Sequence, residues 1–203
     1  GYSIASNDLD IRGAGLVFGY KQSGVVSQVG VEYYNSLLKN SLNKKLNKPI
    51  EPKVPFLSYW GKSLLPISYI SNSEDRFSFY TKINNSKKKE GLADIKNEIR
   101  DRYGKIPKEA ISFINLAEIR TLYTGCFVNG IIINESSLVF SFSNKANPQG
   151  SELVSRILSY RSFNVLEKKF KEGAGLVSVT FLTKLGYNWY DELVNCNSLF
   201  YKT

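Results

Sequence analysis

The first candidates for chemistry are two glycines near the start of the chain. Gly13 and Gly15 enclose Ala14, and a dinucleotide-binding turn begins with such a pair. That turn needs a third glycine at position 18, which is Phe18, and a strand just before the pair. The sequence also contains no complete phosphate-binding loop, in which two glycines at fixed spacing precede Lys and Ser or Thr. We therefore expect no nucleotide cradle and no bound cofactor in this chain.

The absence of histidine restricts catalysis and metal binding together. Without an imidazole, Ser-His and Cys-His nucleophilic catalysis are impossible, and the commonest metal ligand is missing. Cys126 and Cys196 lie far apart and are too few for a disulfide framework or a clustered zinc site. We expect two buried free thiols, as is usual in a reducing cytosol, and no metal site.

The net charge of +9 raises the question of nucleic acid. Much of the excess lies between Lys39 and Lys53 and in Lys87 to Lys89. One interpretation is sequence-independent contact with DNA phosphates. The other is a solvated helix end and a solvated loop. Neither cluster contains an aromatic residue, whereas nucleic-acid-binding modules usually interleave the two types, so we favour the solvated interpretation.

The composition indicates a folded, soluble, cytoplasmic protein. Hydrophobic residues make up 42% and aromatic residues 13% of the chain, enough for an apolar core, and 22% charged residues are too few for a disordered tail. No apolar run reaches the roughly 20 residues of a membrane-spanning helix, so we expect no membrane partner. Gly1 to Ile4 do not resemble a signal peptide, and with no initiator methionine the chain is expected to be a piece of a longer protein.

The elements that must position any site follow from hydrophobic periodicity. Residues 1–24 are glycine-rich and turn-like, and a helix is predicted from Gln28 until Pro49 forbids its continuation. Residues 54–58 and 64–70 are predicted to be extended, with Pro52 and Pro55 keeping the first at an edge or outside a sheet.

Three helices are predicted between residues 73 and 124. Ser73, followed by two acids, marks the start of the first. Gly104 ends the second, and Pro107 opens the third at the preferred first position. Each carries an apolar stripe at helical spacing.

The second half of the chain changes period. Residues 127–133 and 138–142 predict a hairpin around Asn134 to Ser137, and residues 176–182 predict a further strand. Helices are expected from Pro148 and from Asn188 to about Phe200. Helices followed by strands, without regular alternation, indicate an α+β fold.

One segment resembles a known family motif. Asp8 to Gly15, followed by Gly19 to Gly24, is similar to the translocation motif D-L-E-I-R-G-A-G…Q-S-G shared by transcription-repair coupling factors and RecG-type branched-DNA helicases. Asp10 stands where the motif has glutamate, and Leu16 stands at a position that is more often polar.

Downstream segments resemble the coupling factors alone. Val29 to Leu38 is similar to their G-F-x-x-Y-x-x-L-L helix, and Ser63 to Tyr80 to their L-P-x-x-Y-I…R-L-x-x-Y segment. Glu98 to Pro107 is similar to E-L-x-D-R-F-G-P-L-P, which belongs to a terminal domain that RecG-type helicases lack. The resemblance covers about residues 1–125 well and favours the coupling-factor family.

The resemblance implies roles for residues of the translocation motif. Arg12 maps onto the hairpin arginine and Gln22 onto the loop glutamine, which are thought to link nucleotide state to movement along double-stranded DNA. A forked guanidinium and an amide that donates and accepts suit such switching contacts. The motif residues singled out for coupling are Asp10, Arg12, Gly13, Gly15, Gln22 and Gly24.

The resemblance also implies the organisation of the chain. Residues 1–48 would be the end of a second RecA-like lobe, with the helical translocation motif, and residues 49–203 a compact α+β regulatory domain. The parent would be an ATP- and Mg²⁺-dependent DNA translocase, bacterial and nucleoid-associated. It would displace stalled RNA polymerase and recruit nucleotide excision repair. The fragment, whose catalytic residues would lie upstream, is expected not to hydrolyse ATP.

The implied partners are double-stranded DNA and RNA polymerase, through the parent, and a UvrB-like amino-terminal module of the same protein. Docking on that module would hide the surface that recruits UvrA. The aromatic pairs Tyr59-Trp60 and Trp189-Tyr190 are candidates for this contact, although core packing is the more common role of such residues. The alternatives are an autonomous basic nucleic-acid-binding module and a fragment of a RecG-type helicase.

Overall fold

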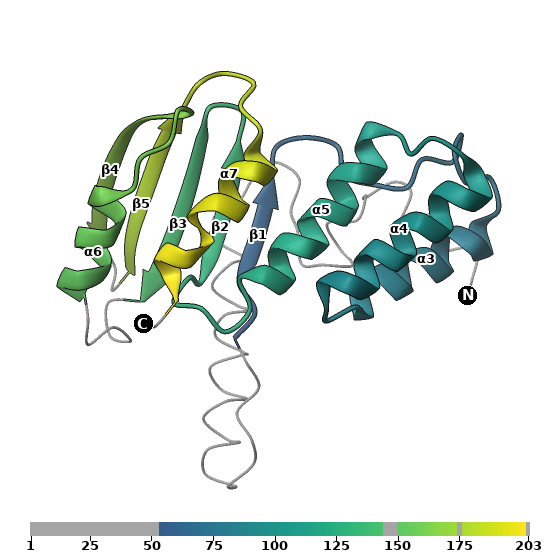
Figure 1. The fold of residues 1–203 in the computed structure, drawn as a ribbon, viewed down its shortest axis with the longest axis horizontal. Coiled ribbons are helices and arrows are strands. Elements are labelled where there is room, and N and C mark those ends of the chain that lie inside the picture. Colours follow the sequence, from purple (N-terminus) through teal and green to yellow (C-terminus); the bar gives the residue numbers. More distant parts are fainter. Residues whose placement is uncertain (1–52, 144–149, 174–175, 202–203) are drawn as a thin grey trace, which may run out of the picture.

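The computed structural model describes residues 53–143, 150–173 and 176–201. Within them, a unit of three helices lies beside a five-stranded sheet (Figure 1). The elements in chain order are β1 Phe56–Tyr59, α3 Ser73–Asn85, α4 Lys89–Tyr103, α5 Lys108–Leu122, β2 Gly130–Asn134, β3 Ser137–Ser143, α6 Gly150–Ser159, β4 Val165–Gly173, β5 Leu176–Thr183, α7 Trp189–Cys196 and the 3₁₀ helix η2 Asn197–Phe200. The predicted α+β class is confirmed.

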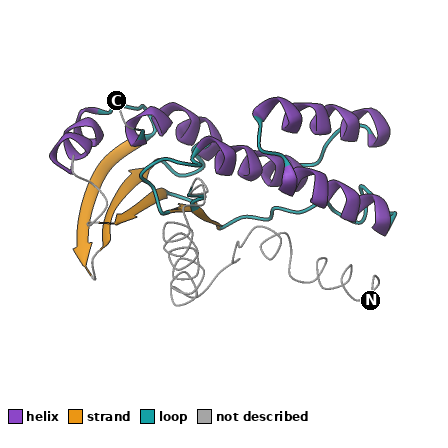
Figure 2. Cartoon of the chain, turned by 90° about the horizontal axis from the view of Figure 1, so that it is seen from below, coloured by secondary structure: helices purple, strands orange, loops and turns teal. Residues whose placement is uncertain are grey.

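The sheet is mixed, with strand order β1-β2-β3-β5-β4. β1 is parallel to β2, and the other pairs are antiparallel. β1 lies at one edge, as its prolines predict, and β2 and β3 form the predicted hairpin. The helices lie on one side of the sheet (Figure 2).

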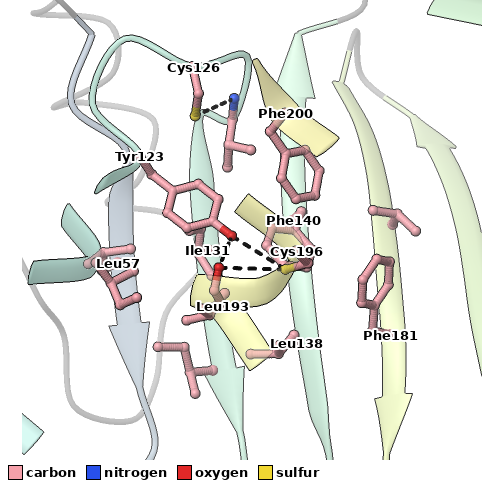
Figure 3. Packing of buried hydrophobic residues seen from close by; sticks show 14 of the residues in the cluster. Leu57, Tyr123, Cys126, Ile131, Leu138, Phe140, Phe181, Leu193, Cys196 and Phe200 are labelled. Carbon is pink, nitrogen blue, oxygen red and sulfur yellow. Dashed lines mark hydrogen bonds between the residues drawn. The ribbon is translucent and has the colours of Figure 1, made fainter. Parts of the chain in front are cut away.

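Rows of side chains that cross the strands contribute to the core between the sheet and the helices. Paired residues of neighbouring strands point to the same face, and one such row is Leu57, Ile131, Phe140 and Val179, all buried. Phe140 stacks on Phe200 of η2 with ring centroids 4.6 Å apart. The C-terminal helices therefore close the sheet-side core (Figure 3).

Tyr123, just after α5, joins that core to α7. Its side chain is buried, and its hydroxyl donates a 2.8 Å hydrogen bond to the carbonyl oxygen of Leu193 (Figure 3). The same hydroxyl lies 3.4 Å from the Cys196 sulfur. Burial raises the pKa of Tyr123 well above its ordinary value, so the hydroxyl keeps its proton. Cys126 and Cys196 are both buried free thiols, as the sequence predicts.

α5 belongs to two apolar cores. Its first half supplies Ala110 and Phe113 to a core formed with α3 and α4, where Phe113 meets Tyr80 edge to face at 5.0 Å between ring centroids. Its second half supplies Leu116 and Ile119 to the sheet-side core. A single helix thus holds the helical unit against the sheet.

The helix ends follow from local chemistry. Asn72, and not Ser73, caps α3, since its side-chain oxygen accepts from the backbone amides of Glu74 and Asp75. Gly104 ends α4 with φ of 80°, a backbone conformation that residues other than glycine rarely adopt. Pro107 was predicted at the first helical position of α5, but it is the N-cap, and the helix begins one residue later at Lys108.

Two predictions of extended structure need correction. The segment predicted as extended at residues 64–70 is a turn, because the amides of Tyr69 and Ile70 both donate to the Pro66 carbonyl. The side chains of Leu65 and Ile70, on either side of this turn, are buried although the segment is not a strand. Conversely, β4 was not predicted at all, although it is the nine-residue edge strand beside β5.

Candidate functional site

The residues predicted for translocation coupling lie outside the described residues. This holds for Asp10, Arg12, Gly13, Gly15, Gln22 and Gly24, and also for the helix predicted from Gln28. Most of the lysine cluster from Lys39 to Lys53 is outside them too. Their roles stay predictions.

Gly61-Lys62-Ser63, which sequence reasoning missed, ends like a phosphate-binding loop and follows strand β1. Phe56 stands where the first glycine of such a loop would be. The chain then enters the turn at Pro66, and α3 begins only at Ser73. Without a helix N-terminus directly after the triplet, this segment does not form a phosphate cradle.

The predicted aromatic pairs meet in the structure. Tyr59 and Trp189 are 5.1 Å apart between ring centroids, and each also contacts its sequence neighbour, Trp60 or Tyr190, at 6.1 Å. Tyr59, Trp189 and Tyr190 pack against the sheet-side core, so their role is mainly structural. Trp60 is 55% exposed and is the outward member of the group.

The family-like segment Glu98 to Pro107 divides into residues that build the fold and residues that do not. Ile99 and Ile106 are buried, and Gly104 makes the helix end. Arg100, Asp101 and Arg102 are exposed on the last turn of α4. A side chain that packing does not require, within a segment that resembles the family, is a candidate for binding.

The exposed charges on α4 are joined to α3. Lys82 bonds Glu98 at 2.9 Å, and Arg102 bonds Asp75 at 3.1 Å and lies 3.7 Å from Glu98. We call Asp75, Lys82, Glu98, Asp101 and Arg102 the α3–α4 polar surface. Its ion pairs are solvent-exposed and individually weak, but together they fix the positions of long side chains.

Tyr103 anchors this surface to the core. Its hydroxyl donates a 2.7 Å hydrogen bond to Asp75, and its ring meets the buried Phe79 edge to face at 6.0 Å. The Tyr103 hydroxyl, and then Arg102, hold the pKa of Asp75 below its ordinary value, so this carboxylate is charged at neutral pH. The surface therefore presents arranged charges of both signs.

In the part of the chain that the structure describes, no three His, Cys, Asp or Glu side chains are placed to hold a metal ion. Among the described helices, none is long and apolar enough to cross a membrane. Lys87 and Lys88 are exposed in the connection between α3 and α4, and Lys89 bonds Glu118 at 3.0 Å.

Sequence reasoning missed a second arrangement, around Glu192 of α7. Glu192 is 1% exposed, and its carboxylate accepts hydrogen bonds from the Tyr160 hydroxyl at 2.8 Å, the Ser162 hydroxyl at 2.7 Å and the Asn164 amide at 3.2 Å. Burial, and then the bond to Glu192, raise the pKa of Tyr160 above its ordinary value. The loop bends at residues 163 and 164, where the Val165 amide donates to the Ser162 carbonyl, and this bend lets Ser162 and Asn164 both reach Glu192.

The fold defines a class: an α+β domain in which three helices lie beside a mixed five-stranded sheet, with the α3–α4 polar surface on the helical unit. The same fold occurs in a crystal structure of the C-terminal domain of transcription-repair coupling factor, with a TM-score of 0.59, 16% sequence identity, and coverage of 73% of this chain and 91% of that one.

The sequence comparisons identify the family. Residues 61–153 match the family described as TRCF domain. The chain is 32% identical over 155 residues to the transcription-repair-coupling factor of Buchnera aphidicola, 33% over 158 residues to that of Staphylococcus haemolyticus and 32% over 152 residues to that of Escherichia coli. These matches cover 71%, 75% and 71% of this chain, but only 18%, 14% and 13% of those proteins. The chain belongs to the transcription-repair-coupling factor family and corresponds to its C-terminal domain.

Proposed function

We propose that this chain is the regulatory C-terminal part of a DNA translocase that acts on stalled RNA polymerase and recruits excision repair. The domain docks on the UvrB-like amino-terminal module of its parent and covers the surface that binds UvrA. The family relationship supports the setting of DNA repair. The observation that carries the docking role is the exposed Asp101 and Arg102 in a family-like segment that does not need them for packing.

The α3–α4 polar surface suits a reversible intramolecular contact. A tethered domain meets its partner at high effective concentration, so a modest interface is enough. When the domain separates from its partner, a docking surface made of paired charges is hydrated by water. The separated domain therefore does not expose a large apolar area on that surface. Charged groups at such an interface mainly give specificity and correct orientation.

The motor part of the parent supplies the energy. ATP and Mg²⁺ act in the parent, whose phosphoryl-transfer residues are not recognisable in this chain. Arg12 and Gln22, in the segment that resembles the translocation motif, couple nucleotide state to movement along double-stranded DNA. The division at about residue 49 then separates a coupling segment from a masking domain.

Reversal of one charge tests the docking role. Among the described residues, the ion pair of Asp101 is the long one with Arg100, at 3.9 Å. The fold therefore does not depend on a short ion pair of Asp101. In the full-length parent, Asp101→Arg should strengthen UvrA binding about tenfold or more, since like charges facing each other at an interface cost several kcal/mol. Titration of purified proteins measures the affinity.

Two controls bracket this result. Glu135→Arg reverses an exposed carboxylate in the β2–β3 turn, far from α4 in the chain, and should leave UvrA affinity unchanged. Deletion from Pro49 onward removes the mask entirely and sets the upper limit. If that deletion leaves UvrA affinity unchanged, the masking role is wrong. If only Asp101→Arg has no effect, the mask lies elsewhere on the domain.

A further inference from the structure

The outer edge of the sheet carries basic and aromatic side chains together. β4 is the last strand, and the loop before it and the turn after β5 run beside it. The exposed or half-exposed residues of this region, which we call the β4 edge surface, are Arg161, Phe163, Leu166, Lys169, Phe170, Lys171, Lys184 and Leu185. Unlike the lysine clusters recognised in the sequence, this region has aromatic rings as well as cations. Phe170, paired with the buried Val179, points to the core face of the sheet, and Lys169 and Lys171 point to the opposite face.

Phe163 is the most exposed large apolar side chain of the described residues, at 86%. The loop that carries it is not loose. Its alternate residues Ser162 and Asn164 bond the buried Glu192 carboxylate, so the residues between and before them, Phe163 and Arg161, point outward. A ring held in solvent by a buried network is arranged in advance for a ligand, which reduces the entropy lost on binding.

The surroundings of Phe163 are cationic and apolar. The Lys184 ammonium lies over its ring, 3.0 Å from the centroid. The backbone amide of Lys184 donates to the Asn164 carbonyl and joins two segments that also carry Leu185, 75% exposed, and Leu166, 65% exposed. One face of the ring thus has a cation, and the joined segments expose further apolar side chains.

Protection of a sheet edge does not explain this arrangement. Lysines on edge strands hinder the pairing of one sheet with another, and Lys169 and Lys171 fit that role. The exposed Phe163, Leu166 and Leu185 do not fit that role, because exposed apolar side chains favour association. We therefore infer that the loop with Phe163 binds a partner.

We propose that the β4 edge surface binds single-stranded nucleic acid. An unpaired base stacks on Phe163, and the phosphates on either side meet Arg161 and the lysines of β4. Stacking on an aromatic ring requires a base that is free of its complement, so a duplex is a poorer ligand. Lys169 and Lys171 lie farther along β4, on the same face as Glu167, which pairs with Lys169 at 3.3 Å. An extended phosphate chain would meet these lysines and compete with Glu167 for Lys169.

Fluorescence anisotropy with the complete chain tests this proposal. The probes are labelled oligothymidylate and oligouridylate of about 15 nucleotides, within the usual site sizes, and a duplex of equal length. Single strands should bind more tightly than the duplex, and Phe163→Ala should weaken them about tenfold. Phe163→Trp should retain the binding. Comparison of the two single strands distinguishes a DNA ligand from an RNA ligand.

The matched controls separate stacking from charge. Lys169→Glu with Lys171→Glu should weaken binding more than Lys87→Glu with Lys88→Glu, which changes the net charge equally on a surface without the aromatic loop. Equal affinity of Phe163→Ala and the unmodified chain overturns the proposal, as does a duplex that binds at least as well. Absence of binding also overturns it and would assign the surface to a protein partner.

Discussion

The Ser162 hydroxyl and the Glu192 carboxylate are joined by a 2.7 Å hydrogen bond that ties the loop before β4 to α7. Glu192 is buried, and all three side-chain donors of the bonds described above come from one short loop. Hydrogen bonds to a charged acceptor contribute about 1.5–3 kcal/mol each, and donors left without an acceptor inside the protein are costly.

Glu192→Ala should therefore lower the free energy of unfolding by about 2–4 kcal/mol, which is a large single-site effect. Urea unfolding followed by circular dichroism measures it. Glu135→Ala, at an exposed turn, should change the same quantity by less than about 0.5 kcal/mol. Equal stabilities of the two variants would mean that the hydrogen bonds of Glu192 contribute nothing to the free energy of unfolding beyond what water provides.

Thiol burial predicts a loss of stability at high pH. Burial raises the pKa of Cys126 to about 11 and that of Cys196 to about 12. Above about pH 9 the unfolded thiols lose protons that the folded ones keep, so the unfolded state is favoured increasingly as the pH rises. From pH 9 to 10.5 each thiol should remove on the order of 1 kcal/mol.

Urea unfolding at several pH values measures this slope, and Cys126→Ala should make it shallower. A thiol reagent provides an independent measurement. Neither cysteine should react quickly in the native protein, and both should react in urea, because the thiolate is the reactive form and both sulfurs are buried. Rapid reaction of both thiols without urea would contradict their burial.

Gly104 should resist substitution because of its backbone. It has φ of 80° and ψ of −150° at the end of α4, and a Cβ there would meet no atom within 4 Å. Any effect of Gly104→Ala is thus strain and not a clash, and it should cost about 1–3 kcal/mol. The midpoint of thermal unfolding measures it. Lys105→Ala, at the next exposed position, serves as control and should leave the midpoint nearly unchanged.

The isolated chain should show no ATP hydrolysis, with or without DNA. In the full-length parent, Arg12→Ala and Gln22→Ala should leave hydrolysis present and abolish displacement of a roadblock on DNA. A coupled ATPase assay and a triplex-displacement assay measure the two activities separately. Turnover by the repurified chain would refute the fragment hypothesis, and displacement by the two variants would refute the coupling role.

Elements with one buried face were predictable from the sequence, and β4 was not. The helices between residues 73 and 124 and the hairpin at Asn134 to Ser137 carry regular apolar stripes that packing reproduces. β4 borders the sheet with charged residues on both faces, so its sequence has no apolar alternation to recognise. The turn at Pro66 is the opposite case: its apolar residues are buried in a turn, but their pattern in the sequence is typical of a strand.

The candidate sites were predictable only in part. Resemblance singled out Glu98 to Pro107, but the division into buried and exposed residues depends on how α4 lies against α3 and α5. The partners of Glu192 are 28 to 32 residues away in the chain, a separation that no local pattern spans. Local periodicity reports burial, whereas a site is defined by contacts between distant segments.

The parallel pairing of β1 with β2 has a consequence for how the chain is made. Phe56 pairs with Gly130, so β1 leaves the ribosome about 70 residues before its neighbour in the sheet. At about 5–20 residues per second this interval lasts roughly 4–15 s. During that time α3, α4 and α5 can assemble from local contacts, while β1 waits as an unpaired strand. Pro55, just before the strand, and the shortness of β1 limit its pairing with other nascent chains until β2 arrives.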